Sequence, residues 1–256
     1  MASQVKFFVA LCFILINVLV NVQGYEFTIG PHADVDITKF EATLTVPPFS
    51  KVGIHKIGAG CTNQTHSYAH ENRLSDHNPG KWEVDMMHGN GGIATDNNIL
   101  PGDKIYNTFE YNTGTHATIN NVTIVPGSQG INAGQKTRTK IDVVNIPQEV
   151  PTAGKLNVVR LYFRPSAGAV WDVGPIVWEN VIITSRTTDS SWCSDSWKIS
   201  DDLSIAGGNK FWGEGDQTMC QYDRMTWEPK KDNIRFVGYS DQELLKLCIS
   251  ALALTS

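Results

Sequence analysis

Residues 156–163 read LNVVRLYF, a stretch in which two kinds of side chain alternate. Val159, Leu161 and Phe163 are apolar, whereas Arg160 and Tyr162 lie between them and carry polar groups. Because a β-strand turns successive side chains to opposite faces, this pattern predicts a strand with one face in a core. Its other face is expected to meet water.

Similar short segments recur along the chain. They cover residues 39–46, 51–58, 81–87, 103–112, 117–125, 140–146, 175–185 and 218–228. Turn-forming residues separate them, as in Pro-Gly at 101–102 and PTAG at 151–154, and almost no helical periodicity accompanies them. We therefore expect an all-β fold in which two antiparallel sheets pack as a β-sandwich of the jelly-roll kind.

The amino-terminal residues 1–24 have the features of a secretory signal peptide. Lys6 precedes an unbroken apolar run from Phe7 to about Val20, and small residues follow it. Cleavage before Tyr25 is expected, which makes the protein secreted and extracellular. No comparable second apolar run follows, so we expect no membrane span after signal removal.

The carboxyl-terminal residues 240–256 are the one place where a helix is expected. Ser240 and Glu243 form a capping-box pattern ahead of the apolar stretch ELLKLCISALAL. A lipid-anchor processing signal is the alternative interpretation of this tail. Between the two ends, residues 25–239 are expected to form one β-sandwich domain.

Charge and motif content exclude several classes of function. The chain has a formal net charge of −5 and no basic tract, which argues against nucleic acid and anionic membrane surfaces as partners. It contains no phosphate-binding loop, dinucleotide-binding fingerprint or nucleophile-elbow pattern. No cofactor is expected, apart from a metal ion at the histidines considered below.

The cysteines predict two disulfides. Signal removal takes Cys12 away and leaves an even number for an oxidising compartment, namely Cys61, Cys193, Cys220 and Cys248. Three pairings are possible, and Cys193–Cys220 is favoured because strand-like segments flank the loop between these residues. Cys61–Cys248 would then join the two ends of the domain. Asn63 and Asn121 each begin an acceptor pattern for N-glycosylation, so a glycoprotein is expected.

The stretch KWEVDMM at 81–87 carries two neighbouring acids. On a strand, Glu83 and Asp85 point the same way at about 7 Å from each other, an arrangement that serves acid–base chemistry or a solvated face equally well. EVDMMH resembles the strand motif of laminarinase-type glycoside hydrolases. The resemblance implies Glu83 as nucleophile and Asp85 as its tuning residue.

The acid/base place of that motif falls on Met87, or on His88 if the strand is bulged. Neither is a carboxylic acid, and a retaining mechanism needs two carboxyl groups about 5–5.5 Å apart. A hydrolase would have to supply a second acid across a cleft, for which Glu110 and Asp172 are the candidates.

A wider resemblance covers most of the mature chain. The order of TLTVPPF at 43–49, LPGDKIYNTFEYN at 100–112 and PIVWENVIIT at 175–184 is similar to secreted concanavalin A-like sandwiches of the glutamic-peptidase (eqolisin-like) kind. In that family a Gln and a Glu on the concave sheet activate a water. The strand expected to carry the Glu is 156–163, which offers Arg160 and Tyr162 instead. Gln64 is the nearest candidate for the place of the Gln. The resemblance implies the fold and not the peptidase chemistry.

The stretch HSYAHENRLSDH at 66–77 is dense in possible metal ligands. His66, His70 and His77 are candidates for a zinc or copper site. The alternative is a polar surface loop, because a His-x3-His pair faces one side only on a helix and this stretch has little helical pattern.

Tryptophans suggest sugar binding, because a flat apolar indole matches the C–H face of a pyranose. Trp212 lies in GGNKFWGEGDQ, a Gly-rich stretch that is expected to be an exposed loop, with Glu214 and Asp216 beside it to bond hydroxyl groups. Trp82, next to Glu83, is a second candidate contact.

These features favour a secreted, lectin-like protein that binds extracellular glycans or cell-wall polysaccharide, without catalysis. One alternative is an extracellular hydrolase, either a glycosidase that uses Glu83 and Asp85 or a glutamic-type peptidase. Another is a structural or effector-like secreted protein with no small ligand.

Overall fold

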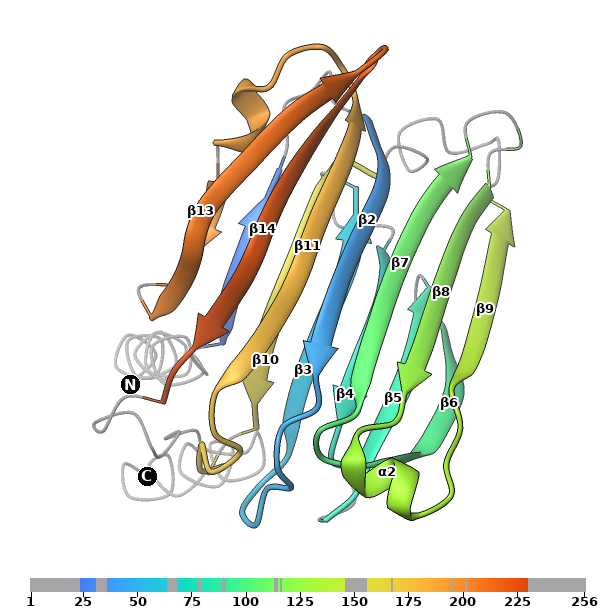
Figure 1. Ribbon diagram of the computed structural model, residues 1–256, viewed down its shortest axis with the longest axis vertical. Coiled ribbons are helices and arrows are strands. Elements are labelled where there is room, and N and C mark those ends of the chain that lie inside the picture. Colours follow the sequence, from blue (N-terminus) through green and yellow to red (C-terminus); the bar gives the residue numbers. More distant parts are fainter. Residues whose placement is uncertain are drawn as a thin grey trace, which may run out of the picture.

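The alternating segments form strands of two packed sheets (Figure 1), which confirms the predicted antiparallel β-sandwich. This computed structural model describes residues 24–30, 36–63, 69–77, 80–88, 91–112, 115, 117–145, 156–166, 168–194, 196–200 and 202–229. Residues 1–23 of the expected signal peptide and the expected helix at 240–256 lie outside the described residues.

Each sheet has seven strands. Sheet A has the order β12 (Ser196–Ile199), β1 (Tyr25–Ile29), β10 (Val158–Pro165), β3 (His55–Thr62), β4 (Ala69–Ser75), β5 (Trp82–His88) and β6 (Gly91–Ile99). Sheet B has the order β13 (Leu203–Glu214), β14 (Gln217–Trp227), β11 (Ile176–Arg186), β2 (Asp36–Thr45), β7 (Lys104–Asn112), β8 (Ala117–Val125) and β9 (Arg138–Asn145). Sheet B faces the viewer in Figure 1, with sheet A behind it.

Helical structure is confined to short turns in the part of the chain that the structure describes. A one-turn helix, α2 (Ser128–Asn132), connects β8 to β9, and the 3-10 turn η1 (Ser191–Cys193) precedes β12. Among these helices none is long and apolar enough to cross a membrane.

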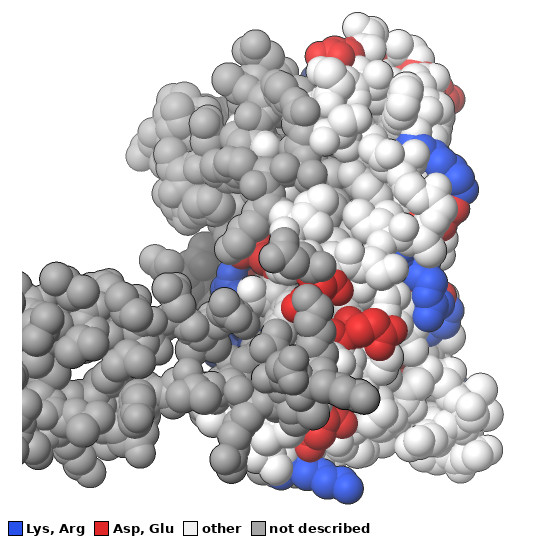
Figure 2. Space-filling model, turned by 90° about the vertical axis from the view of Figure 1, so that its left-hand side faces the viewer, with Lys and Arg blue, Asp and Glu red and all other residues white. Residues whose placement is uncertain are grey.

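Charged side chains are distributed unevenly around the sandwich. Figure 2 shows the side that lies to the left in Figure 1, where acidic side chains gather at mid-height and lysines and arginines lie along one border. This local concentration of acids agrees in sign with the net charge of −5.

Strand β10 is the predicted alternating strand, and its inner face behaves as expected. Val159, Leu161 and Phe163 are buried against sheet B, while Arg160 lies on the outer face. Tyr162 also lies on the outer face but is only 1% exposed, because the side chains of Arg160 and Arg164 flank its ring. The outer face is therefore less open to water at this position than the alternation predicts.

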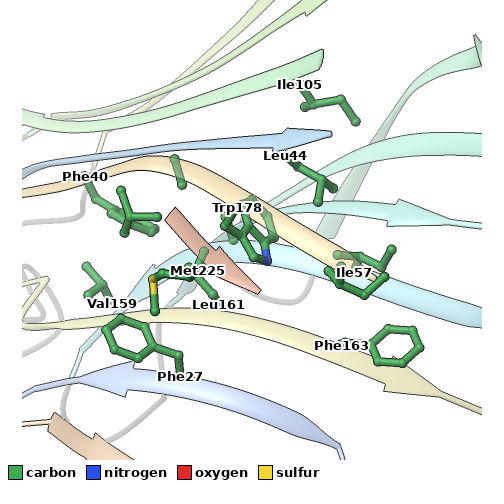
Figure 3. Close-up of a cluster of buried hydrophobic side chains, with 14 of the residues drawn as sticks. Phe27, Phe40, Leu44, Ile57, Ile105, Val159, Leu161, Phe163, Trp178 and Met225 are labelled. Carbon is green, nitrogen blue, oxygen red and sulfur yellow. The ribbon is translucent and has the colours of Figure 1, made fainter. Parts of the chain in front are cut away.

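The hydrophobic core fills the space between the sheets (Figure 3). Trp178, Leu44 and Phe40 of sheet B meet Ile57 and Leu161 of sheet A, and all five are almost fully buried. Full burial of one such side chain contributes about 1.5–3 kcal/mol to folding. Both inner faces are thus buried in the core, and the outer faces remain accessible to ligands.

Candidate functional site

The two neighbouring acids of β5 lie on the outer face of sheet A. Alternate residues of this strand point into the core, whereas Glu83 and Asp85 are partly exposed. Their expected position on one face is confirmed. In the strand register, Asp85 faces Arg73 of β4, whose Nη2 donates a hydrogen bond of 3.0 Å to the Asp85 carboxylate.

A third acid, Glu71, lies on the same outer face, opposite Met87, and was not identified from the sequence. It belongs to β4 and accepts a 3.0 Å hydrogen bond from Arg160 and another from the hydroxyl of Tyr162, both on β10. Burial and the nearby Glu71 carboxylate raise the pKa of Tyr162 well above its usual range. The alternation in AHENRLS could have revealed Glu71, since it separates Glu71 and Arg73 from the apolar Leu74.

Strand β3 lies between β10 and β4, and it leaves room for Tyr162 of β10 to reach Glu71 of β4. Gly58 faces Tyr162 in the register, and a Cβ atom at Gly58 would lie 2.3 Å from the tyrosine ring. With no side chain there, the ring lies over β3 and its hydroxyl reaches Glu71. Any larger residue at this position would displace Tyr162.

Glu71, Arg73 and Tyr162 border a groove of about 490 Å³ on sheet A. Its lining residues are Gly24, Glu26, Ile54, Lys56, Glu71, Arg73, Tyr162, Arg164, Pro165 and Ser166. Glu71 and Asp85 are each held by a guanidinium group. Glycoside hydrolysis requires a carboxyl group that donates a proton to the leaving group, and both of these carboxylates already accept hydrogen bonds from arginines.

His88 does not belong to this face. It follows Met86 on the inner side of β5, and its Nδ1 lies 3.1 Å from the Oδ2 of Asp142, which belongs to β9 in the other sheet. The register between β4 and β5 has no bulge, so Met87 shares the outer face with Glu83. The suggested place of His88 in a catalytic set was therefore wrong, because strand alternation turns it away.

Two other expectations about the 81–87 region also fail. Trp82 is 0% exposed and its Nε1 donates a 3.0 Å hydrogen bond to the carbonyl oxygen of Pro47, so it is a core residue and not a sugar contact. Glu110 lies on the outer face of sheet B, and the Asp172 carboxylate accepts a 2.8 Å hydrogen bond from the backbone N–H of Lys51. Neither acid lines the groove on sheet A.

The histidines of the 66–77 stretch do not converge. Residues 69–75 form strand β4, which places His70 near one end and the exposed His77 beyond the other, at about 23 Å along the chain. His70 is buried on the inner face, and His66 lies outside the described residues. No group of three or more metal-binding side chains is present in the described ranges. The extended strand β4 thus separates His70 from His77, and the polar surface loop given as the alternative is a strand over residues 69–75.

The disulfide between Cys193 and Cys220 is present, as predicted, and joins η1 to β14. Cys61 is a buried free thiol whose pKa burial raises well above its usual range, so the structure does not contain the second predicted pair. Its expected partner, Cys248, lies outside the described residues.

The two glycosylation sequons differ in accessibility. Asn63 is 1% exposed, so its side chain has no space for a glycan in this fold. Asn121 lies on the outer face of sheet B, partly exposed and opposite Ile141. Glycosylation at Asn121 stays a prediction.

The Gly-rich stretch around Trp212 is a strand and not the expected exposed loop. It forms β13, which a two-residue turn at Gly215 and Asp216 joins to β14. Trp212 nevertheless keeps 39% of its surface exposed. Glu214 is exposed at the end of this hairpin, and the Asp216 carboxylate lies 3.9 Å from Nε of Arg186.

Trp212 stands at one wall of a groove of about 540 Å³ on the outer face of sheet B. A single row of register partners crosses five strands from Trp212 to Glu110. The lining residues are Thr38, Lys39, Glu41, Glu110, Tyr111, Asn112, Ile182, Thr184, Arg186, Trp212, Gln217 and Met219. The groove therefore combines an exposed indole with an apolar floor and several polar side chains.

Comparison with models of known protein families found no match, and no curated protein matches the sequence. Among solved structures, the chain resembles scytalido-glutamic peptidase with a peptide-based transition-state analogue, at 11% identity over 79% of this chain and 98% of that chain, with a TM-score of 0.47. It also resembles the eqolisin SCP-B (13% identity, 79% and 98% covered, TM-score 0.44) and a Bacillus licheniformis β-glucanase (10% identity, 80% and 78% covered, TM-score 0.29). The structural neighbours are thus glutamic peptidases and β-glucanases, and no similarity of sequence places this chain in either family.

Proposed function

We propose that this protein is an extracellular, lectin-like binder of glycan chains that holds them in the groove of sheet B. The observation that carries this proposal is the half-exposed indole of Trp212 at the wall of a groove with hydroxyl-bonding side chains. Exposed aromatic rings in concave, partly polar sites are typical of ligand contacts.

The apolar part of the groove suits the face of a sugar ring. Trp212 pairs with Met219 in the register, and Met219 pairs with Thr184 on β11. A pyranose that stacks on the indole would therefore rest beside the Met219 thioether. The row from β13 to β7 spans about 19 Å, which is longer than one sugar ring and favours an oligosaccharide.

The polar part of the groove suits sugar hydroxyl groups. Glu41 and Glu110 accept hydrogen bonds only, and Gln217 can both donate and accept. Lys39 forms a 3.0 Å ion pair with Glu41, which holds that carboxylate in place. The groove contains both donors and acceptors, and its cations Lys39 and Arg186 balance its acids Glu41 and Glu110. This lining favours neutral polysaccharide.

The disulfide between Cys193 and Cys220 supports an oxidising, extracellular setting. It agrees with the signal peptide expected from the sequence. A secreted protein with this groove would meet polysaccharide outside the cell.

The test is retention of the purified protein on neutral insoluble polysaccharides and a glycan array, with Trp212→Ala as the variant. Loss of a central aromatic contact costs about 2 kcal/mol or more, so affinity should fall about 30-fold. Phe211→Ala is the matched control, because Phe211 is 59% exposed on the same strand and points to the opposite side. Melting temperatures of both variants should stay close to that of the parent.

Equal binding by Trp212→Ala and the parent protein would contradict the proposal, as would failure of the parent protein to bind any neutral glycan. A large loss of melting temperature in Trp212→Ala would mean that the indole serves the core.

Hydrolysis is the second candidate function, and the observation that favours it is that Glu71, Glu83 and Asp85 all lie on the outer face of sheet A. An assay for released products, run in the same binding experiments, distinguishes hydrolysis from binding alone. Released sugars or peptides that disappear in Glu71→Gln would establish a hydrolase. If the protein is not retained on any glycan and releases no product, a structural or effector-like role remains.

A further inference from the structure

Two cationic side chains face each other on the outer face of sheet A. Arg164 of β10 and Lys56 of β3 are direct register partners, which places their Cβ atoms about 4.5–5.5 Å apart. Like charges in this position repel each other and destabilise the sheet. Packing alone gives no reason to place them together.

Other arginines of this face are neutralised within the fold. Arg160 is paired with Glu71, and Arg73 with Asp85. Among the described residues, neither Lys56 nor Arg164 has a carboxylate within ion-pair distance. Their positive charges therefore remain available at the mouth of the groove.

The side chain of Arg164 contacts neighbouring residues without a ligand. Its guanidinium carbon lies 4.5 Å from the centre of the Tyr162 ring, and its Cγ lies close to Gly24, where a Cβ atom would be 3.2 Å away. Tyr162 is in turn held by its hydrogen bond to Glu71. A planar guanidinium group that is already oriented loses little freedom when it binds a carboxylate.

The same groove contains acceptors as well as cations. Glu26 and Glu71 line it together with Lys56, Arg164 and the hydroxyl-bearing Ser166. Two carboxylates close to the cations disfavour a doubly charged sulfate or phosphate. They accept hydrogen bonds from hydroxyl groups, so the lining matches a molecule that carries one carboxylate and several hydroxyls.

We propose that the groove of sheet A binds acidic polysaccharide through the carboxylate of a uronic acid unit, held by Arg164 and Lys56. This site is separate from the groove around Trp212, which lies on the opposite face of the sandwich. It goes beyond the proposed binding of neutral glycans and does not depend on it.

The attraction is local. The chain carries a net charge of −5, and acidic side chains gather on the edge shown in Figure 2. A polyanion is therefore not drawn to the whole molecule, and binding must arise at the two cations. Added salt should weaken it, since Lys56 is partly exposed and Arg164 is exposed.

The test uses the purified protein with fluorescently labelled oligogalacturonate as the probe, at low and physiological salt. Lys56→Gln and Arg164→Gln should each weaken binding about tenfold or more, because each removes a charge-assisted hydrogen bond. Lys136→Gln removes an exposed positive charge elsewhere and is the matched control. It should leave the affinity unchanged.

The comparisons between variants keep the two sites distinguishable. Trp212→Ala should bind oligogalacturonate as the parent protein does, while Lys56→Gln should keep its affinity for neutral glycans. Unfolding temperatures report whether Arg164→Gln disturbs Tyr162, whose ring Arg164 contacts. If that variant is destabilised, Lys56→Gln still tests the site.

Three outcomes would overturn the assignment. The first is a parent protein that does not bind oligogalacturonate, and the second is equal binding by Lys56→Gln and Lys136→Gln. The third is preference for dextran sulfate over oligogalacturonate, which would replace the carboxylate by a sulfate ligand.

Discussion

At the scale of single residues, burial in the interior of the sandwich changes the pKa of His70. His70 is fully buried on the inner face of β4. Burial and the neighbouring His88 lower its pKa to about 4, although Asp142 acts in the opposite direction. The fold therefore favours the neutral form of this imidazole.

The lowered pKa of His70 predicts a loss of stability in acid. Between pH 6.5 and 4 the unfolded chain takes up a proton at this histidine and the folded protein does not, so the free energy of unfolding falls as the pH falls. The loss approaches about 3 kcal/mol and levels off below pH 4. Urea unfolding of the parent protein and His70→Gln at pH 7, 5.5 and 4.5 measures it.

The variant His70→Gln should show a smaller decline of stability over this range. His77→Gln, which changes an exposed histidine beyond the same strand, should decline as the parent protein does. Parallel curves for the parent and His70→Gln would show that other groups cause the acid sensitivity.

At the scale of elements, one covalent link fastens the edge of the sandwich. Cys193 of η1 is bonded to Cys220 of β14, and its carbonyl oxygen accepts a 3.0 Å hydrogen bond from the hydroxyl of Tyr222. Strand β14 is also the hairpin partner of β13. The disulfide therefore supports the wall on which Trp212 stands.

Removing this disulfide is expected to lower the free energy of unfolding by about 3–4 kcal/mol, because the link closes a loop with a sequence separation of 27. Denaturant unfolding of Cys193→Ala/Cys220→Ala against the parent protein tests it. Dithiothreitol should destabilise the parent and leave the double variant unchanged. A double variant that still responds to the reductant would contain a second disulfide.

At the scale of the whole molecule, the two grooves lie on opposite outer faces of one packed core. Paired sheets are about 10 Å apart, and the side chains between them are almost fully buried. Neither groove shares a lining residue with the other. A ligand in one groove thus makes no contact that could distinguish two states of the other.

Independent binding at the two faces follows from this arrangement. Calorimetric titration with oligogalacturonate should give the same dissociation constant with and without a saturating neutral oligosaccharide. A change of more than about threefold, equivalent to about 0.7 kcal/mol of coupling, would contradict it. Trp212→Ala, which should not bind the neutral ligand, provides the baseline.

The sequence by itself determined the features that depend on local periodicity. Alternation along 156–163 sets which side chains of β10 face the core, and the same rule places Glu83 and Asp85 on one outer face. The favoured Cys193–Cys220 pair was also accessible, since strand-like segments flank the loop that it closes. Such features depend on the direction of side chains within one strand, which residues close in sequence define.

Only the tertiary structure decided which strands are neighbours. Glu71 meets Tyr162 across β3, His88 meets Asp142 of the other sheet, and Trp212 shares a row with residues of β2 and β7. Periodicity does not contain this information, because strand order and register follow from burying all inner faces in one common core. That is the physical reason why the sequence predicted the sandwich but not the contact of Glu71 with Tyr162 or the partners across both grooves.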